Sequence, residues 1–260
     1  MFPSKQSIEA TLSQRGFTLV EIMVAMAIGM LGIVIIMQMA TMFDSQKRTT
    51  TGGDDAQNAG AIALFGLQQN IQQSGYCFST TPPTLNGATL TPVTRNLAAI
   101  NALKDANTDT ILVSYGNDAC APDSASGVAS ATNLNVLAYA VMNGNLMQCD
   151  YLASNCAVAA NWVQIASDIV SLKAQCTSTQ SVRVALVVRS TQLEKTVVTN
   201  NAPTWAGASA IVLTGTTVDA SATDLAARLG GNAWQYYRYK TFETVVPVRN
   251  TIWGGTAGCV

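Results

Sequence analysis

The stretch "SQRGFTLVEIMVAMAIGMLGIVIIMQMATMF", residues 13–43, decides how the rest of the chain can be organised. From residue 17 to residue 43 it holds about 27 residues, more than the roughly 20 that a helix needs to cross the hydrocarbon core of a bilayer. Glu21 is the only charge in this run. A carboxylate at the edge of an apolar core costs roughly 2.5 kcal/mol unless it is paired or lies near the interface. The run therefore predicts a membrane-spanning helix whose single acid needs a partner.

The flanks of this run predict its orientation. Lys5 and Arg15 precede it with one acid, Glu9. The positive-inside tendency therefore places the N-terminus in the cytoplasm and the rest of the chain across the membrane. The following "FDSQKRTTTGG", residues 43–53, offers no small-residue cleavage site of a secretory signal. We expect the run to be retained, and a plain single-pass anchor is the alternative interpretation.

Composition argues against several functional classes. The chain has 260 residues, a net charge of −1 and only 11% charged residues, so no global field draws it toward nucleic acid. Histidine is absent, which removes the commonest general base and the commonest nitrogen ligand of transition metals. No G-x-S-x-G or glycine-rich phosphate loop occurs. We expect a protein that is not an enzyme and that has no cofactor, no catalytic residues and no metal site.

Six cysteines lie beyond the apolar run, and none of their spacings forms paired C-x-x-C zinc knuckles. Disulfides in an oxidising compartment are the preferred interpretation, although six cysteines allow about fifteen pairings. One pair is predicted: the six residues between Cys149 and Cys156 can turn back as a small loop that brings the two Cα atoms within about 7 Å. The cysteines are Cys77, Cys120, Cys149, Cys156, Cys176 and Cys259.

The apolar helix is expected to continue as an amphipathic one. In "AGAIALFGLQQNIQQSGYC", residues 59–77, Leu64, Leu67 and Ile71 follow at spacings of three and four. Ile62 and Phe65 stand beside them. Such spacing is typical of a helix that lies on a core.

Between the two helical parts lies a polar break that contains two glycines and two acids. Glycine inside a helix costs roughly 1 kcal/mol relative to alanine, so Gly52 and Gly53 are expected to loosen the helix there. Asp54 and Asp55 are interpreted as solubilising a bend. The six methionines of the stem offer either a soft-metal site or flexible packing between helices, and packing is the preferred interpretation. They are Met23, Met26, Met30, Met37, Met39 and Met42.

Beyond residue 75, short β-branched runs between turn residues predict an antiparallel β domain. In one run Val184, Leu186 and Val188 share a face opposite Arg183 and Arg189, which predicts one buried side and one wet side. "MNGN", residues 142–145, predicts a hairpin turn, whereas residues 79–96 and 199–210 are expected to be irregular. The candidate strands are residues 109–115, 134–141, 145–151, 168–175, 182–190 and 236–249.

"RGFTLVE", residues 15–21, resembles the N-terminal signal of type IV pilins and their pseudopilin relatives. The resemblance implies that a prepilin peptidase cuts between Gly16 and Phe17 on the cytoplasmic side. Phe17 then becomes the new, N-methylated N-terminus. It also implies a partner for Glu21, the cationic N-terminal amine of a neighbouring stem helix, so that Glu21 acts in subunit assembly.

Four further segments resemble the PilW family of minor type IV pilins: residues 63–77, 168–175, 182–190 and 237–253. The resemblance implies an α+β, pilin-like fold, with a long N-terminal α-helix packed against a C-terminal antiparallel β-sheet domain. It implies a non-catalytic subunit that joins other minor pilins in priming pilus assembly and stays near the tip. A J-class pseudopilin of type II secretion is the runner-up. Where the family pattern has an aromatic residue, this chain has Cys176, which suggests a further disulfide.

The resemblance also gives an expected domain plan: a cytoplasmic prepilin leader over 1–16, a transmembrane half of the stem over 17–43, an amphipathic half over 44–75 and a periplasmic β-rich domain over 76–260. The expected location is the inner membrane in a single pass, and then the pilus at the cell surface. The expected partners are other minor pilins and the major pilin through the stem helices, the prepilin peptidase, and membrane lipid before assembly.

Two segments suggest ligands, and each has a simpler explanation. The aromatic and basic "WQYYRYK", residues 234–240, could clamp single-stranded nucleic acid as part of a pilus-borne receptor. Strand alternation, with Tyr237 and Tyr239 on one face, explains it without nucleic acid, which is not an expected partner.

The second segment is the loop "GNDACAPD", residues 116–123, which offers Asn117, Asp118 and Asp123 as oxygen donors for calcium. The loop lacks the ordered acid spacing and the terminal glutamate of a calcium loop. A solvated turn is therefore the preferred interpretation.

Overall fold

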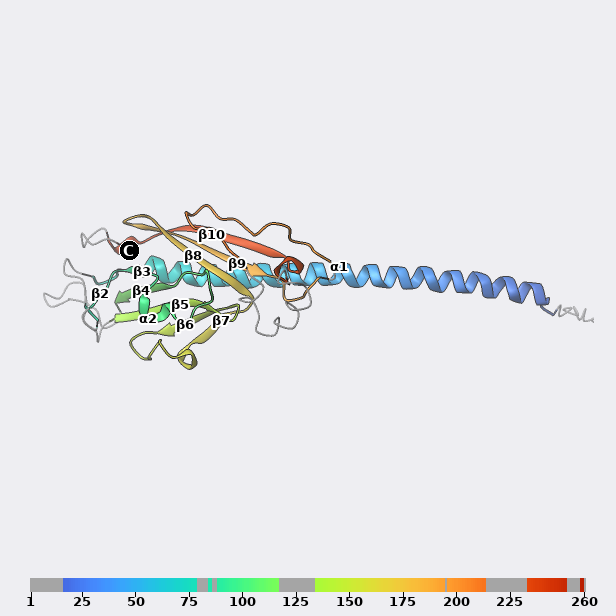
Figure 1. The fold of residues 1–260 in the computed structure, drawn as a ribbon, viewed down its shortest axis with the longest axis horizontal. Coiled ribbons are helices and arrows are strands. Elements are labelled where there is room, and N and C mark those ends of the chain that lie inside the picture. The colour runs from blue at the N-terminus through green and yellow to red at the C-terminus, as the bar shows by residue number, and fades with distance from the viewer. Residues whose placement is uncertain are drawn as a thin grey trace, which may run out of the picture. The chain divides into compact units, whose positions relative to one another are not determined.

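The computed structural model of the chain describes residues 16–78, 84–85, 88–116, 134–194, 196–213, 233–251 and 258–259. The chain divides into two compact units, residues 1–48 and 49–260. Helix α1 (Leu19–Gln73) spans the boundary between them (Figure 1). In the first unit the described structure is this helix and the three residues before it, whereas the second unit holds the rest of the helix and all of the described strands.

Side chains cap both ends of α1. At the start, the backbone N–H of Glu21 donates to Oγ1 of Thr18 over 3.3 Å, the bond of an N-cap residue. At the end, Gly75 takes the positive φ of 78° that closes many helices. The side-chain amide of Asn250 donates to the carbonyl oxygen of Gln73 over 3.1 Å, so the last turn is stabilised from a distant part of the chain.

The glycine pair does not loosen α1. The helix continues without interruption through Gly52 and Gly53, so the expected loosening is wrong. Gly52 is buried, and a Cβ added there would lie 3.4 Å from the Cβ of Ser190. Packing against the β part therefore offsets the low helix propensity of glycine. Asp54 and Asp55 are exposed on this helix and do not mark a bend.

The β part of the second unit forms two antiparallel sheets rather than one, together with a small hairpin (Figure 1). The larger sheet has the order β3 (Val93–Arg95), β4 (Ile111–Gly116), β5 (Leu134–Met142), β6 (Asn145–Asp150) and β7 (Val163–Ala166). The smaller sheet has the order β10 (Tyr239–Pro247), β9 (Ser181–Arg189) and β8 (Ile169–Ser178). The hairpin pairs β1 (Thr84–Leu85) with β2 (Ala88–Thr89). Short helices are α2 (Ala98–Asn101), η1 (Ala159–Asn161), η3 (Ala233–Tyr236) and η4 (Arg249–Thr251).

The predicted α+β class, a long N-terminal helix with antiparallel sheets packed on it, is confirmed. All six candidate strands occur, as β4, β5, β6, β8, β9 and β10. The expectation that residues 79–96 are irregular is wrong, because β1, β2 and β3 lie there. Strand β3 is short: its three residues pair with β4, and the N–H of Val93 also donates to the carbonyl oxygen of Gly258 over 2.9 Å.

The predicted hairpin turn between β5 and β6 is confirmed. Asn143 and Gly144 have φ values of 52° and 71°, the two positive values that a tight primed turn requires. The carboxylate of Asp105 accepts the N–H groups of both residues, each over 2.9 Å. The turn is thus held by its own sequence and by an acid from an earlier loop.

The largest core lies between the second half of α1 and the inner faces of both sheets. From the helix it receives Ala56, Ala63, Leu67 and Ile71. Gly60 belongs to the same face, and a methyl group there would overlap the ring of Phe242 and the side chain of Val188. The small residues therefore let the helix approach the smaller sheet closely.

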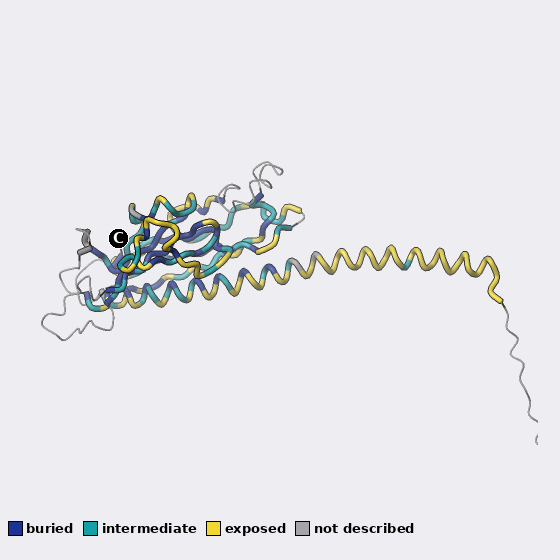
Figure 2. The backbone as a smooth tube through the Cα atoms, turned by 90° about the horizontal axis from the view of Figure 1, so that it is seen from below, coloured by how far each residue is buried: buried dark blue, intermediate teal, exposed yellow. Residues whose placement is uncertain are grey.

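The buried face of the helix differs in part from the predicted one. Leu67 and Ile71 are buried and Leu64 is half-buried, but Ile62 and Phe65 are 70% and 62% exposed. The expectation that these two side chains face the core is wrong, because the buried stripe of the helix contains the small residues and lies on the adjoining side. In Figure 2 the helix shows buried positions only in its second half.

The smaller sheet is covered on both faces at its centre. Val184, Leu186 and Val188 are fully buried on the inner face, as predicted. The opposite face is not wet throughout, because Val187 is also fully buried there and packs in a separate cluster with Ile211. The other members of this cluster are Val170 and Leu213, with Trp205, Trp234 and Tyr239 packed against it.

A further cluster covers the outer face of the larger sheet. It receives Ala138 and Val136 from β5, and it is closed from outside by Ile100 and Trp162. Residues outside the strands thus supply the cover for both sheets.

Candidate functional site

The N-terminal motif lies at the start of α1. Gly16 and Phe17 precede the helix, and both are exposed. Glu21 stands in the first turn of the helix, where a negative charge is stabilised by the helix dipole. Its N–H bond to Thr18 makes it the third residue of an N-capped helix. The hydrogen bond involves the backbone of Glu21, so the cap does not depend on the carboxylate.

The helix that follows is apolar on all sides. From residue 17 to residue 43 the large apolar side chains are all exposed in this unit, Phe17 by 79% and Leu31 by 65%. Phe17, Glu21, Ile22 and Met26 border a shallow, mostly apolar hollow on its surface. By length and composition, α1 is able to cross a membrane. Nothing in the described part of this unit covers the apolar surface, and the six stem methionines are exposed with it.

Disulfides join parts of the second unit. Cys149, at the end of β6, is bonded to Cys156 in the following loop, with a Cα–Cα distance of 5.9 Å. Cys176 on β8 is bonded to Cys259, 83 residues later, with a Cα–Cα distance of 5.7 Å. Cys77 is also disulfide-bonded. The second of these bridges ties the end of the chain to the smaller sheet, beside the pairing of Val93 with Cys259.

Most of the aromatic and basic segment over 234–240 stabilises the fold. Trp234 and Tyr239 pack on the outer cluster of the smaller sheet, and the hydroxyl of Tyr239 donates to the carbonyl oxygen of Trp234 over 3.0 Å. The guanidinium of Arg189 lies 4.7 Å from the ring centre of the buried Tyr237. Arg238 forms an ion pair with Glu194, with a nitrogen–oxygen distance of 2.9 Å. The buried rings are thus engaged within the protein.

The suggested calcium donors Asn117, Asp118 and Asp123 lie outside the described residues, and so do residues 1–15 of the leader and Cys120. In the described ranges, no group of three or more Cys, Asp or Glu side chains is arranged to hold a metal ion.

A polar cleft of about 600 Å³ opens at the C-terminal end of α1, in the second unit. Four segments that are distant in the sequence line it: the last turns of α1 with Tyr76, the end of β4, the start of β5, and η4. We call it the α1-end cleft. The described residues that line it are Gln69, Gln72, Gln73, Tyr76, Tyr115, Gly116, Asn135, Arg249 and Asn250.

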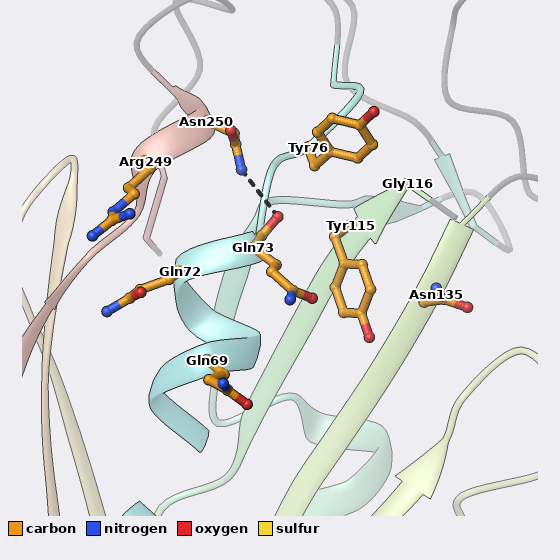
Figure 3. A pocket seen from close by; sticks show the side chains of 9 residues that line it. All are labelled: Gln69, Gln72, Gln73, Tyr76, Tyr115, Gly116, Asn135, Arg249 and Asn250. Atoms are coloured by element: carbon orange, nitrogen blue, oxygen red, sulfur yellow. Dashed lines mark hydrogen bonds between the residues drawn. The ribbon is translucent and has the colours of Figure 1, made fainter. Parts of the chain in front are cut away.

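Figure 3 shows how these side chains lie around the helix end. Gln73 and Tyr115 extend on one side of it, toward Asn135 on β5. Arg249 and Gln72 lie together on the other side. Burial raises the pKa of the Tyr115 phenol, and the nearby negative charge of Asp150 raises it further, so this hydroxyl stays protonated at neutral pH.

Sequence reasoning missed this cleft. The one local signal is the glutamine-rich "LQQNIQQ", residues 67–73, in which the glutamines alternate with the buried positions Leu67 and Ile71. The other lining residues join them only through the fold.

Comparison with protein families matches residues 12–37 to the family described as the prokaryotic N-terminal methylation motif. The chain carries this motif. The matched segment includes Gly16, Phe17 and Glu21, and with the apolar helix it indicates membrane anchoring and supports a pilin-like protein. No curated protein matches the chain significantly.

Among solved structures, a type IV-like pilin from Thermus thermophilus is similar, with a TM-score of 0.37 and 10% identity. The likeness covers 74% of this chain and 96% of that one. A similarity this distant carries no argument about function.

Proposed function

We propose that the chain is a minor pilin of the PilW type that takes part in priming type IV pilus assembly and sits at or near the pilus tip. The observation that carries this proposal is the methylation motif over residues 12–37, which opens a helix whose large apolar side chains are all exposed up to residue 43. A subunit that is held first by lipid and then by other stem helices has a use for such a surface. The compact α+β unit of residues 49–260 supplies the part that stays outside the bilayer.

In this proposal the prepilin peptidase cuts between Gly16 and Phe17, and Phe17 is then N-methylated. Both residues are exposed and precede the first helical residue, so the peptide bond between them is not part of the helix. The leader 1–16 is cytoplasmic, 17–43 is the transmembrane half of the stem, 44–75 continues the stem, and 76–260 is periplasmic.

The mass of the membrane-purified protein tests this processing. We expect a mature chain that begins at Phe17 and carries one methyl group, and a full-length chain in a strain without the peptidase. Retention of residues 1–16 in a strain with active peptidase would contradict the family assignment. Loss of the whole apolar run would instead indicate an ordinary signal peptide.

The proposed role of Glu21 is to pair with the Phe17 amine of a neighbouring subunit. In a low-dielectric setting the attraction between two opposite charges is stronger than most other contacts between apolar helices. We expect Glu21→Gln, which removes the charge but suits the same capped turn, to be processed and folded yet depleted at least about tenfold from sheared pili. Glu21→Ala is expected to behave alike, and Glu21→Asp to be intermediate because its reach is shorter.

Thr18→Ala is the matched control, because it removes the cap of the same turn without removing the charge. We expect it to be recovered in pili at nearly the parental level. If Glu21→Gln were also recovered at that level, with pilus number unchanged, the carboxylate would have no assembly role. A strain that keeps normal pili without this chain but loses protein secretion would favour the secretion pseudopilin.

A further inference from the structure

The α1-end cleft is lined mainly by neutral hydrogen-bonding groups. Gln69, Gln72, Gln73 and Asn135 bring four side-chain amides, and each amide offers donors and an acceptor. A ligand that matches such a lining presents many groups that both donate and accept. Hydroxyl groups on adjacent carbons have this property, and apolar side chains of a peptide do not.

Two tyrosines add flat surfaces to the cleft. Tyr76 is 41% exposed, and Tyr115 is half-buried at the end of β4. An aromatic ring with a polar tip suits a ligand that has an apolar face and polar edges, such as a pyranose ring. Because Tyr115 keeps its proton at neutral pH, its hydroxyl is able to donate as well as accept.

Among the described residues that line the cleft, Arg249 is the one that carries a charge. It is exposed, and within the described part of the chain it makes no ion pair or hydrogen bond. The carbonyl oxygens of Gln73 and Ser74 at the helix end already accept from Asn250, over 3.1 and 3.3 Å. The guanidinium is therefore available for an anion, and its planar fork fits a carboxylate with two parallel hydrogen bonds.

We propose that the α1-end cleft binds an oligosaccharide that carries a carboxylate, such as a uronic-acid chain. The amides and tyrosines hold the sugar rings, and Arg249 holds the acid group. Because Arg249 and Asn135 lie on different sides of the helix end in Figure 3, the ligand is longer than one sugar. One cation among the described lining residues matches one carboxylate better than it matches a nucleic acid, which carries one phosphate for each nucleotide. The site is independent of the assembly role proposed above.

The test uses the full chain in a detergent without a sugar head group. Trigalacturonate is titrated by calorimetry beside its methyl ester, which has the same shape and no charge. We expect the acid to bind at least about tenfold more tightly than the ester, as a charge-assisted hydrogen bond allows. Arg249→Gln is expected to remove that difference by weakening the acid alone. Gln73→Ala, which truncates one of the amides, is expected to weaken both probes.

Lys47→Gln is the matched control, because it removes one exposed positive charge far along the chain from the cleft residues. It should leave both affinities within about twofold, since one distant exposed charge is screened by salt. Equal affinity for acid and ester would overturn the proposal, and so would equal effects of Arg249→Gln and Lys47→Gln. Absence of binding at millimolar acid, with an unchanged circular dichroism spectrum, would overturn it as well.

Discussion

The two halves of α1 differ in what they bury. Up to residue 43 the helix is apolar on every side, and its large side chains are all exposed. From residue 49 to residue 73 polar and apolar residues are mixed, and it supplies Ala56, Ala63, Leu67 and Ile71 to the main core. None of the large apolar side chains up to residue 43 belongs to the main core. The helix contributes to that core through a narrow stripe that contains several small residues. Hydrophobicity alone does not locate a core; the partner surface does.

The same substitution in each half of α1 is expected to have very different effects on stability. Leu67 is 1% exposed and Leu31 is 65% exposed. Leu67→Ala is expected to lower the free energy of unfolding by about 2–5 kcal/mol, because it removes buried methyl groups and leaves a cavity. Leu31→Ala should change it by less than about 0.5 kcal/mol. Denaturant unfolding in detergent, followed by tryptophan fluorescence, measures both. Equal losses in the two variants would show that the first half is also part of the folded core.

A second pair of substitutions tests how closely the helix approaches the smaller sheet. Gly60→Ala is expected to lower the free energy of unfolding by about 1–2 kcal/mol, because the clash with Phe242 and Val188 exceeds the gain in helix propensity. Gly66→Ala meets nothing within 4 Å and should raise it by up to about 1 kcal/mol. A stabilising Gly60→Ala would mean that Phe242 rotates away freely and that close approach is not needed.

Much of the fold could be predicted because its signals are local. Alternation in residues 182–190, the Asn-Gly step at 143–144 and the apolar run over 17–43 each need only neighbouring residues. The features that the sequence did not predict depend on residues that are far apart in the chain. Val93 on β3 forms a bridge with Cys259 in addition to its pairing with β4, and Val187 is buried by a segment near Ile211. Ile62 and Phe65 were misplaced because the sequence pattern favoured large residues, whereas the close helix approach required small ones.

The candidate sites divide in the same way. Gly16, Phe17 and Glu21 stand within six consecutive residues, so a pattern in the sequence is enough to suggest them. The loop between Cys149 and Cys156 is short enough to suggest the disulfide that the structure contains. The α1-end cleft brings together residues from 69 to 250, and no local pattern links them.

The smallest expected effect concerns the polar contact between the second half of the helix and β5. The side-chain amide of Asn70 donates to the hydroxyl of Tyr139 over 2.6 Å, and Tyr139 is 1% exposed. Tyr139→Phe leaves that amide without this acceptor and should lower the free energy of unfolding by about 1 kcal/mol at pH 7. No variant in the first half of the helix has a comparable contact to lose among the described residues.

The dependence on pH separates this contact from simple packing. Burial raises the pKa of Tyr139, and the neighbouring Tyr115 raises it further, whereas the bond from Asn70 lowers it. The folded state therefore keeps the phenol proton at pH values where the unfolded chain, with a pKa near 10, has lost it. The stabilisation from this pKa difference is fully present below about pH 10 and is lost as the pH rises toward the folded-state pKa.

Thermal unfolding between pH 8 and pH 11 should thus show a steep fall of the unfolding temperature in the parent and a shallower one in Tyr139→Phe. Some fall remains in the variant, because burial also raises the pKa of Tyr115 and Tyr239. Identical slopes would mean that water reaches the Tyr139 hydroxyl, and the second half of the helix would then be less tightly packed on β5 than its burial indicates.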